Sequence, residues 1–346
     1  MMKGRHIAPL LMISSALAAG GASAQGHGAH DHGAHKKAPA ATQCLGLPVE
    51  KIAIQTYTFA STLADIPVPA EWDTLPVAEK FERLQPSFAK LAGAKPDPAK
   101  LEAVIKQIAA IGYRNIEGMD LIGGSDPAAY AKLLKDNGLQ AVASHGALDK
   151  DKWPAALAAA KARGQRFIGS GGFGAPGLDT LDHVLETARN LNALGEAAAA
   201  EGLTLYVHNH TGEFDNRFPY DHGDGKPVMT SAWEIVAANT DPRFVQFEVD
   251  IFWARLAFKP DRFDDLLAFL TKYRSRIALL HMKDLSATGS VTDMGAGTTD
   301  WRRVIEAAGP QVAYYIYEFD FPSDPAKSAK IGFDYLSCSG QKRGGR

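Results

Sequence analysis

The sequence is poor in cysteine, in excess charge of either sign and in long apolar runs. Its 346 residues include two cysteines and carry a formal net charge of −2 at pH 7. A chain so close to neutral has no long-range field to attract nucleic acid or an anionic membrane. It also has neither a basic stripe nor the ligand spacing of a zinc finger. These absences argue against nucleic acid as a partner.

The first residues have the pattern of an export signal. Lys3 and Arg5 precede a short apolar run over 7–19, and Ala22-Ser23-Ala24 supplies small residues for signal peptidase. The run is too short to span a bilayer stably, and a buried N-terminal strand is the alternative. We therefore expect a signal peptide over residues 1–24 with cleavage near Ala24. The mature protein is then periplasmic or secreted, without stable membrane insertion.

Residues 25–43 are predicted to form a disordered leader. Glycine and alanine surround four histidines, His27, His30, His32 and His35. Such tracts bind transition metals weakly, although a disordered segment without a role has the same composition. We do not expect the active site here.

The two cysteines, Cys44 and Cys338, lie at the two ends of the predicted folded region, 44–340. Export permits a disulfide, and the ends of a domain are often close in space. A closed barrel places its first strand beside its last helix. We therefore predict a Cys44–Cys338 disulfide, and two buried free thiols are the alternative.

Between the cysteines, short β-branched or aromatic runs alternate with alanine- and leucine-rich amphipathic stretches. The strand-like runs are Ile52–Thr58, Asn115–Gly118, Leu139–Ser144, Arg166–Ser170, Leu203–Asn209, Phe244–Asp250, Ile277–His281 and Ala313–Glu318. The helix-like segments include Pro98–Ile111, Pro127–Asn137, Pro154–Ala162, Leu178–Ala200, Ala232–Asn239, Pro260–Tyr273 and Trp301–Ala307. Eight strands separated by helices predict a single α/β domain, a (βα)8 TIM barrel. The proline-containing segment Ala60–Lys95 is expected to form helices that cover one side of the barrel mouth.

Four consecutive predicted strands end in histidine, aspartate, histidine and glutamate. Catalytic groups of barrel enzymes lie at these carboxyl ends. The candidate metal ligands are His208, His210, Asp250, His281 and Glu318. Singly, each has a simpler explanation, such as a helix N-cap for an aspartate. Together, polar groups at four apolar strand ends need a shared partner. Imidazole mixed with carboxylate predicts one divalent metal ion, manganese, zinc, cobalt or iron(II) rather than calcium.

Several stretches resemble the xylose isomerase-like TIM barrel superfamily. They are Tyr206–Phe214, Phe247–Trp253, His281–Asp284, Gly295–Trp301 and Tyr317–Asp320. Within it, the sequence is most similar to sugar phosphate isomerase/epimerase-type proteins with a Tyr-His-Asn-His motif. Here that motif reads Tyr206-Val207-His208-Asn209-His210, with a valine inserted. The resemblance covers roughly residues 52–336.

The resemblance implies a metal held by Glu, Asp, His and Glu from the barrel strands. Matched by position, three of these ligands are Asp250, His281 and Glu318. The remaining glutamate has no obvious match on the fifth strand. His208 stands nearest, His210 lies two residues on and faces the same side, and Glu213 follows in the next loop. The fourth ligand is therefore one of these three.

Further groups are expected at the same mouth. The candidate substrate-binding residues are Glu117, Gln55 and Trp253, and the candidate catalytic residues are Glu318, Glu213, Lys283 and His145. Lys283 shares a face with His281 if the strand continues, and it is a candidate acid–base group with a lowered pKa. A salt bridge to Asp284 or Glu248 is its alternative role, and core packing is the alternative for Trp253.

These features predict a metal-dependent sugar isomerase or epimerase. Glu318 or Glu213 would remove a proton next to a carbonyl, and the metal would stabilise the resulting enediolate. Lys283, His145 or a histidine of the fifth strand would return the proton. Export favours an unphosphorylated sugar or keto-sugar as the small-molecule substrate. A lyase or hydratase acting on 3-keto-glycosides is the close alternative, and a periplasmic metal- or sugar-binding protein is the non-enzymatic one.

Overall fold

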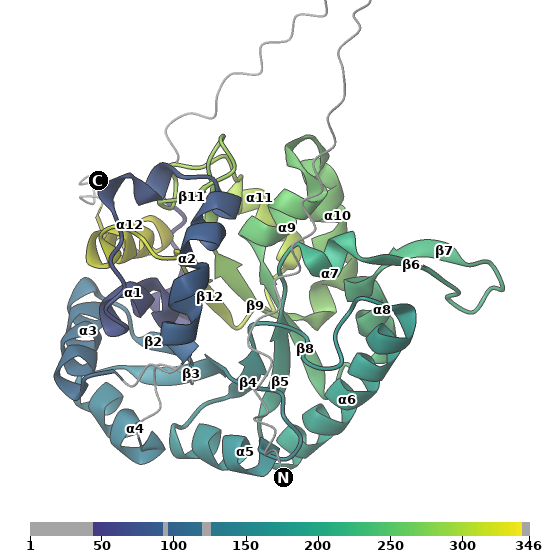
Figure 1. Cartoon of the computed structure of the whole chain (residues 1–346), viewed down its shortest axis with the longest axis horizontal. Coiled ribbons are helices and arrows are strands. Elements are labelled where there is room, and N and C mark those ends of the chain that lie inside the picture. The colour runs from purple at the N-terminus through teal and green to yellow at the C-terminus, as the bar shows by residue number, and fades with distance from the viewer. Residues whose placement is uncertain (1–43, 93–95, 120–125, 341–346) are drawn as a thin grey trace, which may run out of the picture. The chain divides into compact units, whose positions relative to one another are not determined.

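Eight parallel strands close into a barrel with helices around it (Figure 1). The computed structural model describes residues 44–92, 96–119 and 126–340, so the expected signal peptide and leader over 1–43 lie outside the described residues. Around the barrel the strand order is β1-β12-β9-β8-β5-β4-β3-β2. The strands are β1 Ile52–Gln55, β2 Asn115–Met119, β3 Gln140–His145, β4 Phe167–Ser170, β5 Thr204–His208, β8 Val245–Asp250, β9 Ile277–Met282 and β12 Tyr314–Tyr317. The predicted (βα)8 TIM barrel is confirmed.

Each helix-like segment named from the sequence corresponds to an observed helix, and the structure contains further helices besides these. They are α1 Ala60–Leu63, α2 Val77–Ala92, α3 Pro98–Ile111, α4 Pro127–Asp136, α5 Trp153–Ala162, α6 Leu181–Ala200, α7 Gly212–Asp215, α8 Ala232–Asn239, α9 Ile251–Phe258, α10 Phe263–Tyr273, α11 Trp301–Ala308 and α12 Pro325–Ser337. Asp97 caps α3 by accepting hydrogen bonds from the N–H groups of Ala99 and Lys100, with a proline at the helix start. The same helix ends at Gly112, whose φ of 126° and whose contact with the Phe333 ring leave no room for a Cβ.

Predicted and observed elements differ by up to three residues at their ends, and two of these differences occur at 3-10 turns. The first strand was expected to reach Thr58 but ends at Gln55, because the Gln55 side chain accepts the N–H of Tyr57 and starts a 3-10 turn, Thr56–Phe59. The helix predicted from Pro260 is a 3-10 turn as far as Arg262 and becomes α10 only at Phe263. Both differences are local and leave the barrel unchanged.

Alternation along the strands determines which side chains face the barrel interior. Tyr206, Leu279 and Ile316 belong to a small apolar cluster there. Because successive side chains of a strand point to opposite faces, the residue two positions further on faces inward as well. On these three strands that residue is His208, His281 or Glu318. The polar groups therefore lie directly beyond an apolar floor, at the carboxyl end of the barrel.

The segment after β1 is helical, as predicted, with α1, a 3-10 turn at Ala70–Thr74, and α2. Its turn packs against a short hairpin, β10 Asp284–Leu285 and β11 Val291–Thr292, where the Ser290 hydroxyl donates to the Leu75 carbonyl at 2.7 Å. Lys80 of α2 places its ammonium 5.5 Å from the centre of the Phe319 ring, just after β12. The insertion thus lies at the carboxyl end of the barrel, on the β12 side.

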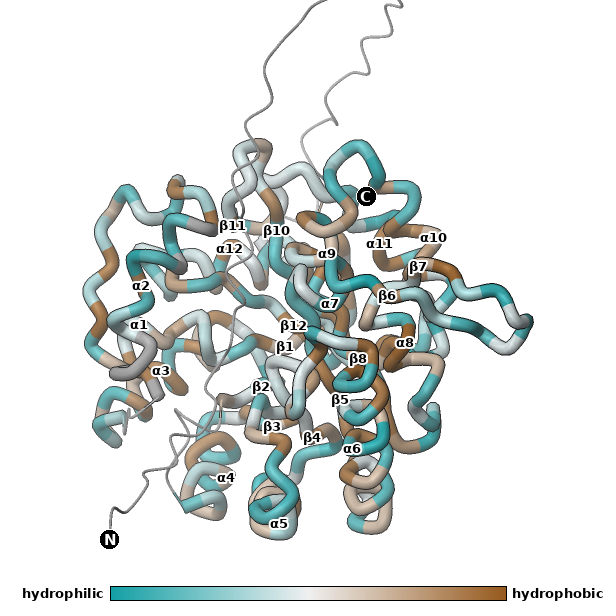
Figure 2. Tube along the Cα trace, turned by 45° about the vertical axis from the view of Figure 1, so that its right-hand side comes forward, coloured by the Kyte–Doolittle hydropathy of each residue, from teal (hydrophilic) through white to brown (hydrophobic). Residues whose placement is uncertain are grey.

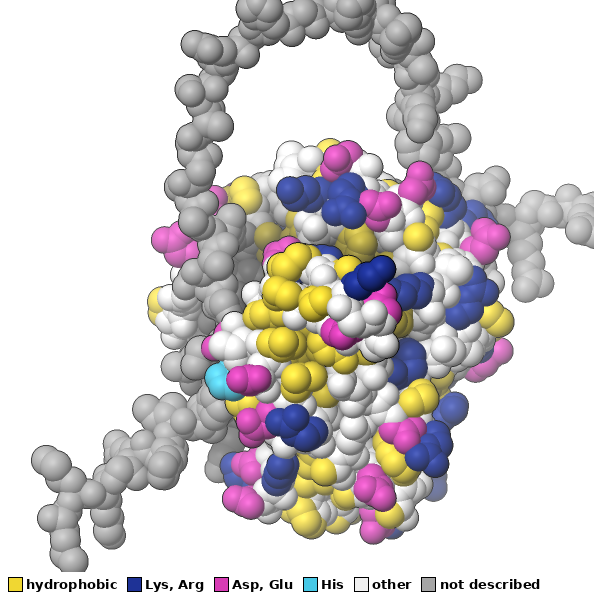
Figure 3. Space-filling view, turned by 90° about the vertical axis from the view of Figure 1, so that its right-hand side faces the viewer, with side chains coloured by type: hydrophobic (Ala, Val, Ile, Leu, Met, Phe, Trp, Pro, Cys, Tyr) yellow, Lys and Arg dark blue, Asp and Glu magenta, His cyan; other side chains and the backbone are white. Residues whose placement is uncertain are grey.

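A second hairpin, β6 Arg217–Tyr220 and β7 Val228–Ser231, was not predicted and projects from the barrel wall (Figure 1). Val228 and Met229 on β7 are 54% and 56% exposed. Figure 2 shows hydrophobic colour on β7 as well as along the buried β5 and β8, and Figure 3 shows hydrophobic side chains gathered on this face of the molecule. The hairpin therefore presents apolar side chains away from the core.

The predicted disulfide is confirmed. Cys44 and Cys338 are bonded, with their Cα atoms 5.2 Å apart. The chain next to Cys44 also pairs with α12, since the N–H groups of Leu45 and Leu47 donate to the Tyr335 and Leu336 carbonyls at 2.8 Å. Among the described residues, none of the helices combines the length and the apolar character needed to cross a membrane.

Candidate metal centre and active site

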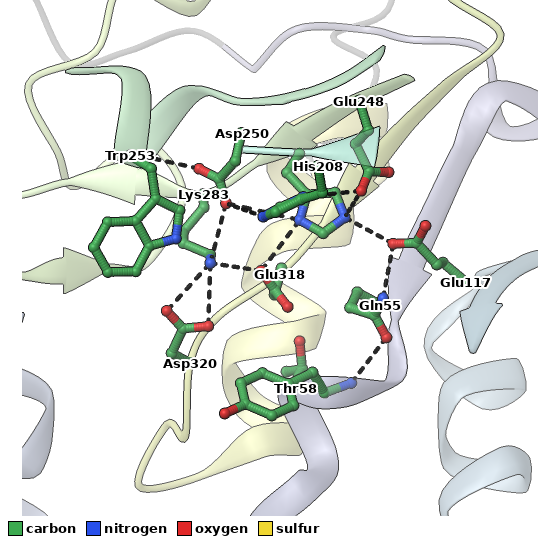
Figure 4. Close-up of polar contacts among 12 residues, drawn as sticks. Gln55, Thr58, Glu117, His208, Glu248, Asp250, Trp253, Lys283, Glu318 and Asp320 are labelled. Atoms are coloured by element: carbon green, nitrogen blue, oxygen red, sulfur yellow. Dashed lines mark hydrogen bonds and ion pairs between the residues drawn. The ribbon is translucent and has the colours of Figure 1, made fainter. Parts of the chain in front are cut away.

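The inward-facing residues at the ends of β5, β8, β9 and β12 converge on one region (Figure 4). Strand register aligns them, because His208 pairs with Glu248 and Asp250 pairs with His281. Two ligand-like groups have donor atoms that all lie within 4.8 Å of one another, Asp250 with His281 and Glu318, and Glu248 with His145, His208 and His281. His281 belongs to both groups.

Three carboxylates surround the ammonium of Lys283, immediately after β9. The Nζ atom lies 3.1 Å from Asp250 Oδ2, 2.5 Å from Glu318 Oε2 and 3.1 Å from Asp320 Oδ1. Burial alone would lower the pKa of Lys283, but these carboxylates outweigh it and hold the pKa well above its usual value. The predicted lowering of the Lys283 pKa is therefore wrong. Among the described residues, Lys283 forms its ion pairs with Asp250, Glu318 and Asp320 and not with Asp284 or Glu248, the partners predicted from the sequence.

The same charges act on the carboxylates. Burial would raise the pKa values of Asp250 and Glu318, but Lys283 is the main group that lowers them instead, with His281 adding to its effect. Asp320 behaves differently, because burial and the neighbouring Glu318 raise its pKa to about 6 despite Lys283. Asp250 and Glu318 are therefore ionised at neutral pH and available to a cation.

Deeper in the barrel, Glu248 is the centre of a histidine cluster. Its Oε2 atom lies 2.8 Å from His145 Nε2, 2.9 Å from His208 Nδ1 and 3.2 Å from His281 Nε2. Burial would raise the pKa of Glu248, but the charge of His281 and hydrogen bonds from His145 and His208 lower it well below its usual value. Glu248 is an ionised acceptor at neutral pH.

Glu117 completes this inner layer. Its Oε2 atom lies 2.7 Å from His281 Nε2 and accepts a hydrogen bond from Gln55 Nε2 at 2.7 Å. Its other oxygen accepts the hydroxyl of Tyr206. Glu117 and Gln55, expected to bind substrate, are fully buried and bound to each other. Both lie beneath the histidines in this arrangement.

These residues fit a divalent metal ion. Five buried carboxylates converge, on Glu117, Glu248, Asp250, Glu318 and Asp320, with Lys283 as the ammonium among them. Lys283 and His281, whose pKa the surrounding carboxylates raise well above its usual value, offset part of this buried negative charge, and a divalent ion would offset more of it. Asp250 Oδ2 forms an ion pair with Lys283 at 3.1 Å but accepts no hydrogen bond within the described part of the chain, and it lies 3.7 Å from His208 Nε2 and 3.8 Å from His281 Nδ1. Two ligand atoms on one ion lie about 3 to 4 Å apart, given bonds of about 2.1 Å.

The other predicted residues lie at the rim of this cluster. The His210 ring is 5.2 Å from both the His208 and the Trp253 ring centres. Burial lowers the pKa of His210 to about 3. Glu213, on α7, accepts the backbone N–H of His210 at 2.8 Å, and burial raises its pKa to about 7. Trp253 places its ring 5.6 Å from the ammonium of Lys283.

Sequence reasoning missed Glu248 and Asp320 as members of the site. Each lies two residues from a predicted ligand, Glu248 before Asp250 and Asp320 after Glu318. The alternation of a strand places such residues on the same face, so the spacing was an available signal. It also missed Asn209, whose side-chain amide bridges to Asp250 by accepting its N–H and donating to its carbonyl, both at 3.2 Å.

Residues 105–336 match the family model of the xylose isomerase-like TIM barrel. The match spans more than half of the chain, so the protein belongs to the xylose isomerase-like TIM barrel family. This confirms the resemblance found in the sequence. The sequence has no significant match among curated proteins.

Solved structures share the fold at low identity. A sugar phosphate isomerase/epimerase from Parabacteroides distasonis ATCC 8503 is 20% identical, with a TM-score of 0.57 over 85% of this chain and 96% of that one. The probable 3-DHS dehydratase AsbF from Bacillus anthracis is 12% identical, with a TM-score of 0.54 over 82% and 97% of the two chains. The IOLI protein with a binding zinc atom is also 12% identical, with a TM-score of 0.53 over 82% and 96%.

Proposed function

We propose that this protein is a divalent-metal-dependent isomerase or epimerase acting on an unphosphorylated sugar or keto-sugar. The observation that carries the proposal is the convergence of Asp250, His281 and Glu318, buried at the carboxyl ends of three neighbouring strands, with ligand atoms within 4.8 Å. Held there, a divalent ion supplies the positive charge that stabilises a substrate oxygen when the adjacent carbon loses a proton. The family match and the isomerase and zinc-binding neighbours support this assignment.

Two proton-transfer groups lie on different sides of His281. Glu318 Oε2 is 3.1 Å from His281 Nδ1, whereas His145 lies on the Nε2 side, with its ring stacked 5.6 Å from that of His281. Burial would lower the pKa of His145, but Glu117 and Glu248 outweigh it and raise the pKa, so His145 can hold a proton to donate. In this proposal Glu318 removes a proton from the substrate and His145 returns one. Return to the same carbon epimerises the sugar, and return to the neighbouring carbon isomerises it.

Lys283 keeps its proton and its charge in this scheme. Its raised pKa makes it a poor base near neutral pH, so it orients a substrate oxygen and balances the carboxylates. The predicted export signal supports an unphosphorylated substrate, because phosphorylated sugars are mostly cytoplasmic.

The test is solvent exchange. The mature protein, loaded with Mn²⁺, is incubated in D2O with a panel of keto-sugars and 3-keto-glycosides, and deuterium at carbons next to the carbonyl is followed by NMR. We expect exchange that is lost in Asp250→Asn and retained in the remote control Asp241→Asn. Expulsion of the aglycone together with exchange would assign the lyase alternative. Absence of both reactions with every substrate would rule the proposal out.

A further inference from the structure

Glu248 touches three imidazoles. The inner carboxylate forms hydrogen bonds with His145 Nε2 and His208 Nδ1 at 2.8 and 2.9 Å. Its Oε2 atom also lies 3.2 Å from His281 Nε2, whose nearer partner is Glu117 at 2.7 Å. The hydrogen bond between His208 Nδ1 and Glu248 leaves Nε2 as the nitrogen of that ring which can contact another group.

The other ring nitrogens of His208 and His281 both lie on the side of Asp250 and Glu318. His208 Nε2 lies 3.7 Å from Asp250 Oδ2, and His281 Nδ1 lies 3.8 Å from the same oxygen and 3.1 Å from Glu318 Oε2. Figure 4 shows His208 between Glu248 on one side and Asp250 on the other. Each of these two imidazoles therefore stands between an inner carboxylate and the outer pair.

We infer that Glu248 is a positioning residue, which holds Nδ1 of His208 by a hydrogen bond so that Nε2 of the same ring faces Asp250. The inference rests on the proposed metal-dependent function and deepens it. It assigns His208, through Nε2, as the fourth ligand in place of His210 or Glu213. Ligating histidines usually donate their other N–H to a carboxylate, which fixes the ring orientation and increases the basicity of the ligand.

A competing arrangement uses the same residues. Glu248 Oε1 has no hydrogen-bond partner among the described residues, and Glu248, His145, His208 and His281 could themselves surround an ion. The two arrangements differ at His208, whose ring would contact the ion through Nε2 in the arrangement that we infer and through Nδ1 in the competing one. They also predict opposite behaviour for His145, which contacts Glu248 but is not a ligand in the arrangement that we infer.

The experiment measures Mn²⁺ and Co²⁺ affinity of the mature protein by chelator competition, with the Co²⁺ absorption spectrum as a second readout. We expect Glu248→Gln to keep one ion per chain but to bind it about 10- to 100-fold more weakly and with a changed spectrum. Glu248→Asp, which keeps the charge, should restore part of the affinity. Asp250→Asn should abolish measurable binding, and His145→Asn should leave affinity and spectrum close to those of the wild type. Thermal unfolding in EDTA establishes that each variant is folded.

Two results would overturn the inference. One is wild-type affinity in folded Glu248→Gln. The other is loss of binding in His145→Asn and Glu248→Gln with retention in Asp250→Asn, which would place the ion on the Glu248 side. If the wild-type protein binds neither ion, the proposed function itself fails, and that outcome is distinct from both.

Discussion

Lys283 balances the charge of the outer carboxylates and competes with a metal ion for them. Its ammonium contacts Asp250 and Glu318, two of the oxygen ligands proposed above, as well as Asp320. The residue is 2% exposed, so water contributes little to this balance. The Lys283 ammonium and a divalent ion would therefore compete for the same carboxylate oxygens.

Replacing this ammonium should separate stability from ion affinity. In EDTA, Lys283→Met should destabilise the protein by about 3 to 5 kcal/mol, the usual result of breaking a buried ion pair. Mn²⁺ affinity should rise by an order of magnitude or more, since a unit charge about 4 Å away contributes on the order of 4 kcal/mol at an effective dielectric constant near 20. Urea unfolding and chelator competition measure the two effects. The exposed pair Lys272–Glu234 supplies the control, Lys272→Met, which should change stability by less than about 1 kcal/mol.

Glu213 should give the folded protein a pH-dependent loss of stability. Burial raises its pKa from 4.5 to about 7, so the folded state holds this proton over a range where the unfolded state has lost it. Stability from this group therefore falls as pH rises from about 4.5 to 7, by about 3 kcal/mol in all. In Glu213→Gln that fall should be absent, so the free energy of unfolding of the variant should rise relative to that of the wild type between pH 5 and pH 8. Parallel urea midpoints for both proteins across this range would contradict the assignment.

At the scale of elements, the sequence predicts where strands end better than it predicts which side chains contact one another. Hydrophobic alternation and helix caps located all eight barrel strands, and the barrel rule then placed Asp250, His281 and Glu318 at one rim. Which carboxylate would meet Lys283 depended on the lateral register of β8, β9 and β12, which no local pattern encodes. The β6–β7 hairpin was missed because its exposed apolar residues, Val228 and Met229, do not follow a buried alternation.

Asn209 couples two of these elements, since its side chain bridges β5 to the backbone of Asp250 at the end of β8. Asn209→Ala should cost about 2 to 4 kcal/mol by leaving buried N–H and carbonyl groups unsatisfied. It should also weaken Mn²⁺ binding, because the Asn209 side chain no longer holds the backbone of Asp250 by hydrogen bonds. Asn192 makes a similar pair of hydrogen bonds, to Asn239 and Asp241, away from the site. Asn192→Ala should therefore reduce stability and leave ion affinity unchanged. Equal affinities in the two variants would contradict the coupling.

At the scale of the whole molecule, the site exists only because the barrel closes. Glu117 and Gln55 come from the first two strands, whereas His281 and Glu318 come from the last two, and β1 pairs with both β2 and β12. The sequence supported closure through the count of eight strands and placed Glu117 and Gln55 at the barrel mouth, but the contacts of Glu117 with Gln55, Tyr206 and His281 could not be anticipated. Their partners lie across the barrel interior, far apart along the chain.

The Cys44–Cys338 disulfide joins the two ends of this closed barrel, at a sequence separation of 294. A cross-link over so long a loop mainly restricts the unfolded chain, and its loss should cost about 3 to 5 kcal/mol. The double variant Cys44→Ser/Cys338→Ser should therefore unfold at lower urea and temperature, and wild-type protein in a strong reductant should match it. Because the bond lies at the end of α12 and before β1, Mn²⁺ affinity under native conditions should stay the same. A loss of affinity in the double variant would show that the cross-link also shapes the mouth of the barrel, contrary to this account.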